Sequence, residues 1–172
     1  MKSIRLTTWI GAPVERCFRL SLSIDLHVIA ARTTGERVAS GVRSGLLGMN
    51  DMVTWSGRYL GLKYSHTNLI DSLRPYTYFR DVMVEGTFLG FEHEHHFAPL
   101  NDGTRMRDEV RVSAPMGWVG EMLLRKHLVQ LLKRRNAMLK RVAESGEWQR
   151  FLISEARRRP AGVGRRENAL RA

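Results

Sequence analysis

The chain has 172 residues, of which 43% are hydrophobic and 26% are charged. This composition excludes an intrinsically disordered chain and fits one globular domain with a substantial core. A single cysteine, Cys17, excludes an intramolecular disulfide, and the lack of a signal-peptide pattern at the start predicts a cytoplasmic protein. No apolar run approaches the roughly 20 residues that a membrane-spanning helix needs, so we expect no transmembrane segment.

The formal net charge is +11, and part of it gathers near the C-terminal end. Residues 157–166 hold five arginines around proline, alanine and glycine, which is typical of a solvated, disordered basic tail. Such charge attracts anionic membranes and nucleic acids without selecting among them. The tail therefore predicts weak anionic-surface contact, and no zinc-finger, helix-turn-helix or RNA-recognition motif indicates a more specific partner.

The first elements are a strand and two short helices. Residues 3–10 alternate apolar and polar side chains, which predicts a strand with one buried face. Pro13 suits the first position of a short helix over residues 14–20. Ser23 is a good N-cap for a second short helix, with Asp25 near its positive end.

Residues 37–113 have the pattern of β structure throughout. Strands are predicted over residues 52–61, 62–73, 76–86, 88–98 and 104–114, separated by glycine, proline and turn residues. The Asp-Gly pair at residues 102–103 is a strong hairpin signal. Short turns between successive strands indicate an antiparallel sheet.

One long helix is predicted over residues 118–144, with an apolar stripe that Arg135 interrupts. The apolar face of a curved sheet must be buried against another element, and the apolar stripe of this helix can pack against it. The order of elements predicts an α+β helix-grip fold: a curved antiparallel sheet around a long C-terminal helix, with two short helices after the first strand. We place this domain at residues 1–146 and the tail, a short helix followed by disorder, at residues 147–172.

Several segments together resemble the helix-grip superfamily called SRPBCC, which includes START domains and polyketide cyclases. They are "SGLLGMNDMVTWSGRYLGL" (44–62), "RPYTYFRDVMVEGTF" (74–88), "FEHEHHF" (91–97), "DGTRMRDEV" (102–110) and "APMGWVGE" (114–121). The match is tighter to one uncharacterised bacterial branch. The resemblance implies a cavity between sheet and long helix that holds apolar or amphipathic small molecules, and it implies no single chemistry.

The strand "FEHEHHF" carries most of the candidate chemistry. Side chains on a strand alternate between its faces, so the phenylalanines share a face with two histidines. We expect that face to point inward, with Phe91, His93, His95 and Phe97, and the other to point outward, with Glu92, Glu94 and His96.

Three charged residues are expected to join these histidines. Asp108 shares the apolar face of residues 104–112 with Met106, while Glu109 and its arginine neighbours point to water. Asp81 shares a face with Phe79, and Arg135 lies on the covering helix. Because burying an unpaired charge is very costly, each of these groups should have a partner.

Three interpretations of these groups compete. A His-x-His pair with a carboxylate could hold a metal, but the close-spaced ligand motifs of structural zinc sites are absent, so we expect neither a metal nor another cofactor. A histidine held by an aspartate under an apolar cavity could transfer protons in a cyclase or dehydratase, with His93, His95 and Asp108 as candidates. A buried hydrogen-bond network that only fixes sheet and helix is favoured over catalysis.

The sequence therefore predicts a non-catalytic protein that binds a lipophilic or aromatic small molecule. The alternatives are a cyclase- or dehydratase-like enzyme and an interaction module that docks through the basic tail. The expected ligand-binding residues lie on the inward strand faces and the long helix: Trp55, Tyr59, Asp81, Met83, Phe91, His93, His95, Phe97, Met106, Asp108, Leu128, Leu131, Arg135 and Met138.

Overall fold

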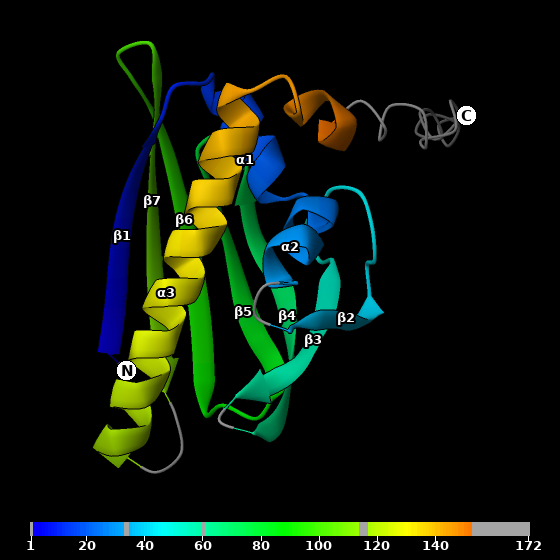
Figure 1. Cartoon of the computed structure of the whole chain (residues 1–172), viewed down its shortest axis with the longest axis vertical. Helices are drawn as coiled ribbons and strands as arrows, with labels where there is room; N and C mark the ends of the chain where they lie inside the picture. Colours follow the sequence, from blue (N-terminus) through cyan, green and yellow to red (C-terminus); the bar gives the residue numbers. More distant parts are fainter. Residues whose placement is uncertain (1, 33–34, 60, 114–116, 153–172) are drawn as a thin grey trace, which may run out of the picture.

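The computed structural model describes residues 2–32, 35–59, 61–113 and 117–152. The arginine-rich segment and the disorder predicted for it lie outside the described residues. In chain order the elements are β1 (Lys2–Ile10), α1 (Val14–Ser21), α2 (Ile24–Ala31), β2 (Arg37–Gly41), β3 (Met52–Tyr59), β4 (Leu62–Arg74), β5 (Tyr78–Gly86), β6 (Gly90–Leu100), β7 (Gly103–Ser113) and α3 (Gly117–Glu144). The predicted α+β helix-grip fold is confirmed (Figure 1).

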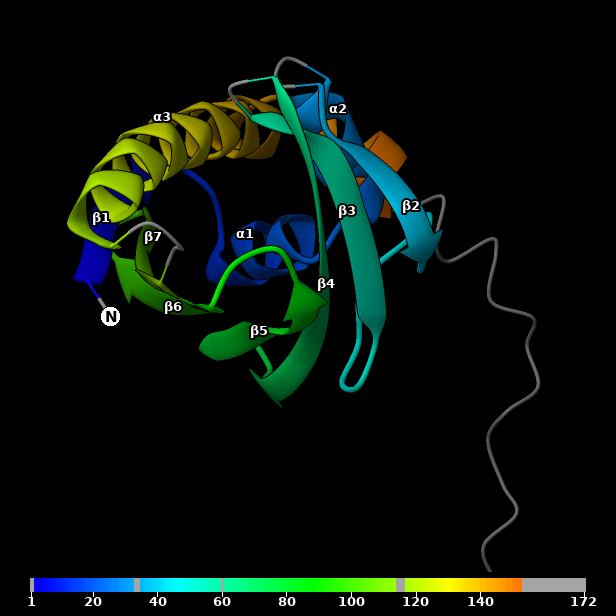
Figure 2. The same cartoon turned by 90° about the horizontal axis from the view of Figure 1, so that it is seen from below.

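The strands form one seven-stranded antiparallel sheet in the order β1-β7-β6-β5-β4-β3-β2. From β2 to β7, each strand pairs with the strand that follows it in the chain. β1 pairs with β7 and forms one edge of the sheet. The sheet curves strongly, and α3 runs along its open side with α1 and α2 filling the far end of the curve (Figure 2). The sequence pattern does not resolve β2 as a separate strand, because this short edge strand is mostly exposed and has no apolar alternation.

The core lies between the sheet and the helices. Phe18 of α1 packs edge-to-face against Phe79 of β5 and Phe97 of β6, with ring centroids 5.7 and 5.3 Å apart. Leu139 of α3 and Met106 of β7 are buried in the same cluster. A second cluster lies nearer the start of α3: Ile4, Val110, Val112, Leu124, Leu128 and Leu132.

The globular part of the chain continues past the boundary predicted at residue 146. Residues 148–152 are helical, and Phe151 and Leu152 are buried in the core cluster of α1 and α3. The guanidinium of Arg16 lies 4.4 Å above the ring of Trp148. Residues up to 152 are therefore part of the domain.

Glu109, on the outward face of the sheet, is less exposed to solvent than the sequence predicted. This residue points away from the helix as predicted, yet it is only 7% exposed. Arg5 and Arg111 each place a nitrogen 3.1 Å from its carboxylate and cover it. Long arginine side chains can shield a carboxylate on a sheet surface from water, so outward orientation does not guarantee exposure.

Within the part of the chain that the structure describes, no helix combines the length and apolar character needed to cross a membrane.

The start of α2 depends on Ser23, as the sequence predicted. The Ser23 hydroxyl accepts a hydrogen bond from the backbone N–H of Leu26 at 3.4 Å, and Ser23 is fully buried. We expect Ser23→Ala to lower the free energy of unfolding by about 1 kcal/mol, because a helix N–H loses its partner. Urea denaturation of the two proteins measures this, and equal stability would show that the cap contributes nothing.

Candidate functional site: a buried His–Asp cluster at one end of a pocket

The central strands bring four polar residues together on the concave face. On β6, His93 and His95 are buried while the residues between and beside them are half-buried, as alternation predicts. The register places His93 opposite Asp81 of β5 and His95 opposite Asp108 of β7. We call Asp81, His93, His95 and Asp108 the His–Asp cluster.

Asp108 is the centre of this cluster and has no exposed surface. Its Oδ1 lies 2.9 Å from Nε2 of His93 and 3.1 Å from Nδ1 of His95. Arg135 of α3 donates to the same oxygen at 2.8 Å, and Asn136 donates to Oδ2 at 2.7 Å. A buried carboxylate is thus surrounded by donors from one strand and one helix, which fixes α3 on the sheet.

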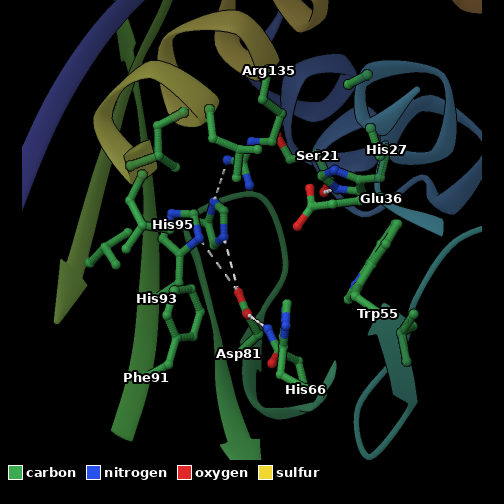
Figure 3. A pocket seen from close by; sticks show the side chains of 18 of the residues that line it. Ser21, His27, Glu36, Trp55, His66, Asp81, Phe91, His93, His95 and Arg135 are labelled. Carbon is green, nitrogen blue, oxygen red and sulfur yellow. Dashed lines mark hydrogen bonds and ion pairs between the residues drawn. The ribbon is translucent and has the colours of Figure 1, made fainter. Parts of the chain in front are cut away.

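Asp81 faces the two histidines from the other side. Its Oδ2 lies 3.3 Å from Nε2 of His95 and 3.8 Å from Nδ1 of His93. Its Oδ1 accepts a hydrogen bond from the side-chain amide of Asn68 on β4 at 2.7 Å. The two imidazoles therefore lie between the carboxylates of Asp81 and Asp108. Asp81 lies on the pocket side of the rings (Figure 3).

Burial and charge set the ionisation of the cluster. Burial would raise the pKa of Asp108, but Arg135 and the hydrogen bonds from His93 and His95 hold it well below its usual range. Burial also acts to raise the pKa of Asp81, while the hydrogen bond from His95 and the charge of His93 bring it down to about 2. Burial, assisted by the charges of His95 and Arg135, lowers the pKa of His93 to about 4. Both carboxylates are therefore ionised at neutral pH, and His93 is neutral.

The cluster borders a pocket of about 170 Å³ between the sheet, α2 and α3. Aromatic and aliphatic side chains from several strands and from α3 form most of its wall: Val53, Trp55, Ile70, Phe79, Phe88, Phe91, Val110, Leu124, Leu128, Leu131 and Leu132. Five of the six histidines of the chain line it: His27, His66, His93, His95 and His127. The pocket is thus apolar over most of its wall, with the His–Asp cluster on one side and the polar side chains of His27 and Glu36 on the side of α2 (Figure 3).

The structure brings many of the sequence-predicted residues to this pocket. Those that line it are Trp55, Asp81, Phe91, His93, His95, Leu128, Leu131 and Arg135. Five others lie elsewhere. Phe97 and Met106 are in the core cluster and Met138 packs against it, while Asp108 lies behind the histidine rings rather than on the pocket wall. Met83 is half-buried on β5 outside the lining, and the side chain of Tyr59 is outside the described residues.

Sequence reasoning missed several polar residues of the site. Asn136 lies between Leu132 and Leu139 at the spacing of one helix face. The sequence could therefore have predicted that Asn136 is on the buried side of the long helix. His66 and Asn68 alternate on β4, but a strand with few apolar residues gives no sign of which face is inward. His27 and His127 come from helices whose rotation about their own axes is decided by packing.

Two buried polar atoms in the described part of the pocket wall have no hydrogen-bond partner. They are Nδ1 of His66 and Oδ1 of Asn68. Leaving a buried polar atom unpaired costs about 1–3 kcal/mol. Both atoms lie on the pocket face of β4 near Asp81, so a polar group entering the pocket could satisfy them.

His27 makes the stability of the protein depend on pH. Its Nε2 lies 2.7 Å from the backbone oxygen of Ser21, and burial together with the charge of Arg135 lowers its pKa from 6.5 to about 3. Between these values the unfolded chain binds a proton that the folded chain does not. The stability that neutral His27 contributes is therefore present at pH values above 6.5 and decreases as the pH falls below 6.5.

We expect His27 to account for a loss of about 1–2 kcal/mol in the free energy of unfolding between pH 7 and pH 5. Urea denaturation at both values, for the natural protein and His27→Gln, isolates this contribution because other groups titrate alike in both. Parallel pH profiles would show that His27 titrates normally in the folded state.

No protein-family model and no curated protein matches the sequence. Solved structures match along most of the chain. TTHA0849 from Thermus thermophilus is 19% identical with a TM-score of 0.63, over 80% of this chain and 97% of that chain. A START superfamily protein from Mycobacterium smegmatis is 14% identical with a TM-score of 0.56, over 81% of this chain and 98% of that chain.

A plant protein shares the same architecture. Major latex-like protein 151 from Panax ginseng is 11% identical with a TM-score of 0.58, over 79% of this chain and 95% of that chain. Such low identities establish the fold and nothing finer. The chain has a START-like, SRPBCC-type fold, and its place in one bacterial branch of that superfamily stays a prediction.

Proposed function

We propose that the protein binds a small lipophilic or aromatic molecule in the pocket, without transforming it. The observation that carries this proposal is the shape and polarity of the pocket: a space of about 170 Å³ with a mostly apolar wall and a smaller set of polar groups, the His–Asp cluster among them. Ligand sites commonly combine an apolar wall with a few polar groups that orient the ligand. The START-like fold supports the proposal, because the superfamily resemblance implies a cavity at this place.

The size of the pocket limits the ligand. A dry apolar cavity of about 150 Å³ is sufficient for benzene. A space of about 170 Å³ therefore suits a ligand body of about one ring unless side chains move. Removing that body from water supplies affinity at about 25 cal/mol per Å² of apolar surface. A polar end that donates a hydrogen bond would fit Oδ1 of Asn68.

The properties of His93 favour binding over proton transfer. A general base works best when its pKa lies near the working pH, whereas the pKa of His93 is lowered to about 4. Its Nε2 is already engaged with Asp108 at 2.9 Å. A histidine in this state is a weak base at neutral pH, as expected for a group with a structural or orienting role.

One observation favours the second candidate function, a cyclase- or dehydratase-like enzyme. His93 is held by Asp108 and borders an apolar pocket, which is the arrangement that proton transfer to a bound substrate needs. Turnover of an aromatic polyketide that disappears in His93→Gln and His95→Gln would support this candidate. Ligand binding without turnover would leave the binding protein as the better description.

The binding proposal is tested with a panel of small ligands and with a variant whose larger side chain reduces the volume of the pocket. Single-ring aromatic alcohols, amines and carboxylates are titrated into the purified protein by calorimetry, and native mass spectrometry looks for a co-purified molecule. We expect Leu131→Trp, which adds bulk to the pocket wall, to weaken binding about tenfold or more, equivalent to about 1.4 kcal/mol.

Leu89→Trp is the matched control, because Leu89 is 73% exposed and does not line the pocket. Thermal unfolding of both variants separates lost binding from lost folding. Equal affinity of the two tryptophan variants, or no binding across the whole panel and no co-purified molecule, would contradict the proposal.

A further inference from the structure

We propose that Asp81, His93 and His95 bind a divalent transition-metal ion, Zn²⁺ or Fe²⁺, at the polar end of the pocket. Each of the three residues offers one ligand atom, and the three atoms lie within 4.8 Å of one another. The proposal is independent of the organic ligand proposed for the pocket.

The spacing of the ligand atoms fits a metal ion. Oδ2 of Asp81 lies 3.3 Å from Nε2 of His95 and 3.8 Å from Nδ1 of His93. Two ligands at about 2.0–2.1 Å from a tetrahedral ion are about 3.4 Å apart. The two distances from Asp81 are therefore within a few tenths of an ångström of the spacing in such a site.

Asp108 gives His93 the hydrogen-bonded support that metal-binding histidines usually have, and it lies close to His95 as well. Metal-bound imidazoles commonly donate their other N–H to a carboxylate, which fixes the tautomer and the ring orientation. Oδ1 of Asp108 lies 2.9 Å from Nε2 of His93 and 3.1 Å from Nδ1 of His95. If both N–H groups point to Asp108, the lone pairs of Nδ1 on His93 and Nε2 on His95 point toward Asp81.

The remaining contacts of Asp81 leave its second oxygen for the ion. Asn68 holds Oδ1 at 2.7 Å, while Oδ2 is the atom that faces both rings. In that tautomeric arrangement two nitrogen lone pairs face a carboxylate oxygen, and a cation bound among the three atoms would remove their repulsion. Arg135 does not provide that cation, because it contacts Asp108 and lies across the rings from Asp81 (Figure 3).

A competing arrangement needs no metal. If Arg135 donates to Nδ1 of His95, 3.3 Å away, Nε2 of His95 carries the proton and donates to Asp81. A metal titration therefore decides between a proton and a metal ion at the same place.

The ligand set selects the class of ion. Two imidazoles and one carboxylate are the ligands of catalytic zinc sites and of non-haem Fe(II) sites. With three protein ligands, further coordination positions are open to water or to a donor atom of a molecule in the pocket. The expectation that no metal binds rested on missing sequence motifs; here the ligands come from two strands, β5 and β6, whose register no motif encodes.

The test uses tag-free, full-length protein freed of metal by a chelator. Calorimetric titration with Zn²⁺ is expected to show one ion per chain, and Co²⁺ is expected to give the visible absorption of a nitrogen- and oxygen-ligated site. His95→Ala and Asp81→Ala should each weaken Zn²⁺ binding about 100-fold or more, and Asp108→Asn about 10–100-fold.

His96→Ala is the matched control. His96 is the next residue on β6 but lies on the outward face, 3.3 Å from Glu94, and its loss should leave Zn²⁺ affinity unchanged. Circular dichroism shows whether each variant folds, and His95→Gln replaces any alanine variant that does not. The proposal is overturned if the unaltered metal-free protein binds neither ion, or if the site variants bind as tightly as His96→Ala.

Discussion

Replacing Asp108 by alanine is expected to lower the free energy of unfolding by about 3–5 kcal/mol, because it breaks a buried ion pair by removing one partner. The guanidinium of Arg135 would lose the carboxylate oxygen 2.8 Å away, and His93 and Asn136 would lose their acceptors at 2.9 and 2.7 Å. Urea denaturation followed by circular dichroism measures the change.

Asp71→Ala is the control for this prediction. Asp71 also makes a two-pronged ion pair, with Arg80 at 2.6 and 2.9 Å, but on the partly exposed face of the sheet. Ion pairs near the surface contribute about 0–1 kcal/mol, so this variant should lose little. A loss for Asp108→Ala no larger than for Asp71→Ala would show that the buried network is not held together by this carboxylate.

A double variant tests the cause of the Asp108 effect. Replacing a whole buried ion pair by apolar residues of similar volume is often neutral or stabilising. Asp108→Leu combined with Arg135→Met should therefore recover part of the stability lost in Asp108→Ala. Recovery would identify the uncompensated charge of Arg135 as the main cost, and further loss would point to the histidine hydrogen bonds instead.

Replacing Phe79 by alanine is expected to cost about 3–5 kcal/mol as well, through loss of buried aromatic surface and the cavity left behind. Phe79 is 2% exposed, its ring stacks on His95 at 4.0 Å between centroids, and Phe18 packs edge-on against it. Phe79 also lines the pocket, so its loss should let larger ligands enter. Unfolding measurements and titrations with one- and two-ring ligands check both effects.

Tyr78→Ala is the control for the Phe79 variant. Tyr78 precedes Phe79 on β5, but its side chain is half-buried on the other face beside His96. We expect a smaller loss of stability and unchanged ligand size selection, because Tyr78 is not part of the pocket wall. An equal loss in both variants would mean that the stack on His95 is not a principal contact of the core.

The two stability predictions bear on the site in different ways. Asp108 holds the histidine rings in place from behind, whereas Phe79 supports the face of one ring and shapes the pocket. If the His–Asp cluster binds a metal, Asp108 variants should change metal affinity, while Phe79→Ala should change mainly the size of the organic molecule that is accepted. Measuring both ligands on both variants therefore separates the metal proposal from the proposed ligand-binding function.

Local patterns in the sequence determined the elements and their inward faces. Alternation with period two placed His93 and His95 on the buried face of β6 and Asp108 on that of β7, and the structure agrees. The stripe on α3 placed Arg135 among apolar residues. These inferences held because the pleat of a strand and the turn of a helix are properties of adjacent residues.

Only the tertiary structure decided which of these side chains meet. The register between β5 and β6 places Asp81 opposite His93. The position of α3 on the sheet brings the side chain of Asn136 within hydrogen-bond distance of Asp108. The burial of Phe151 and the pocket positions of His27 and His66 also depend on contacts between distant segments. The packing of the whole core selects the register of the strands and the position of α3 on the sheet. A short segment of sequence therefore does not predict either of them.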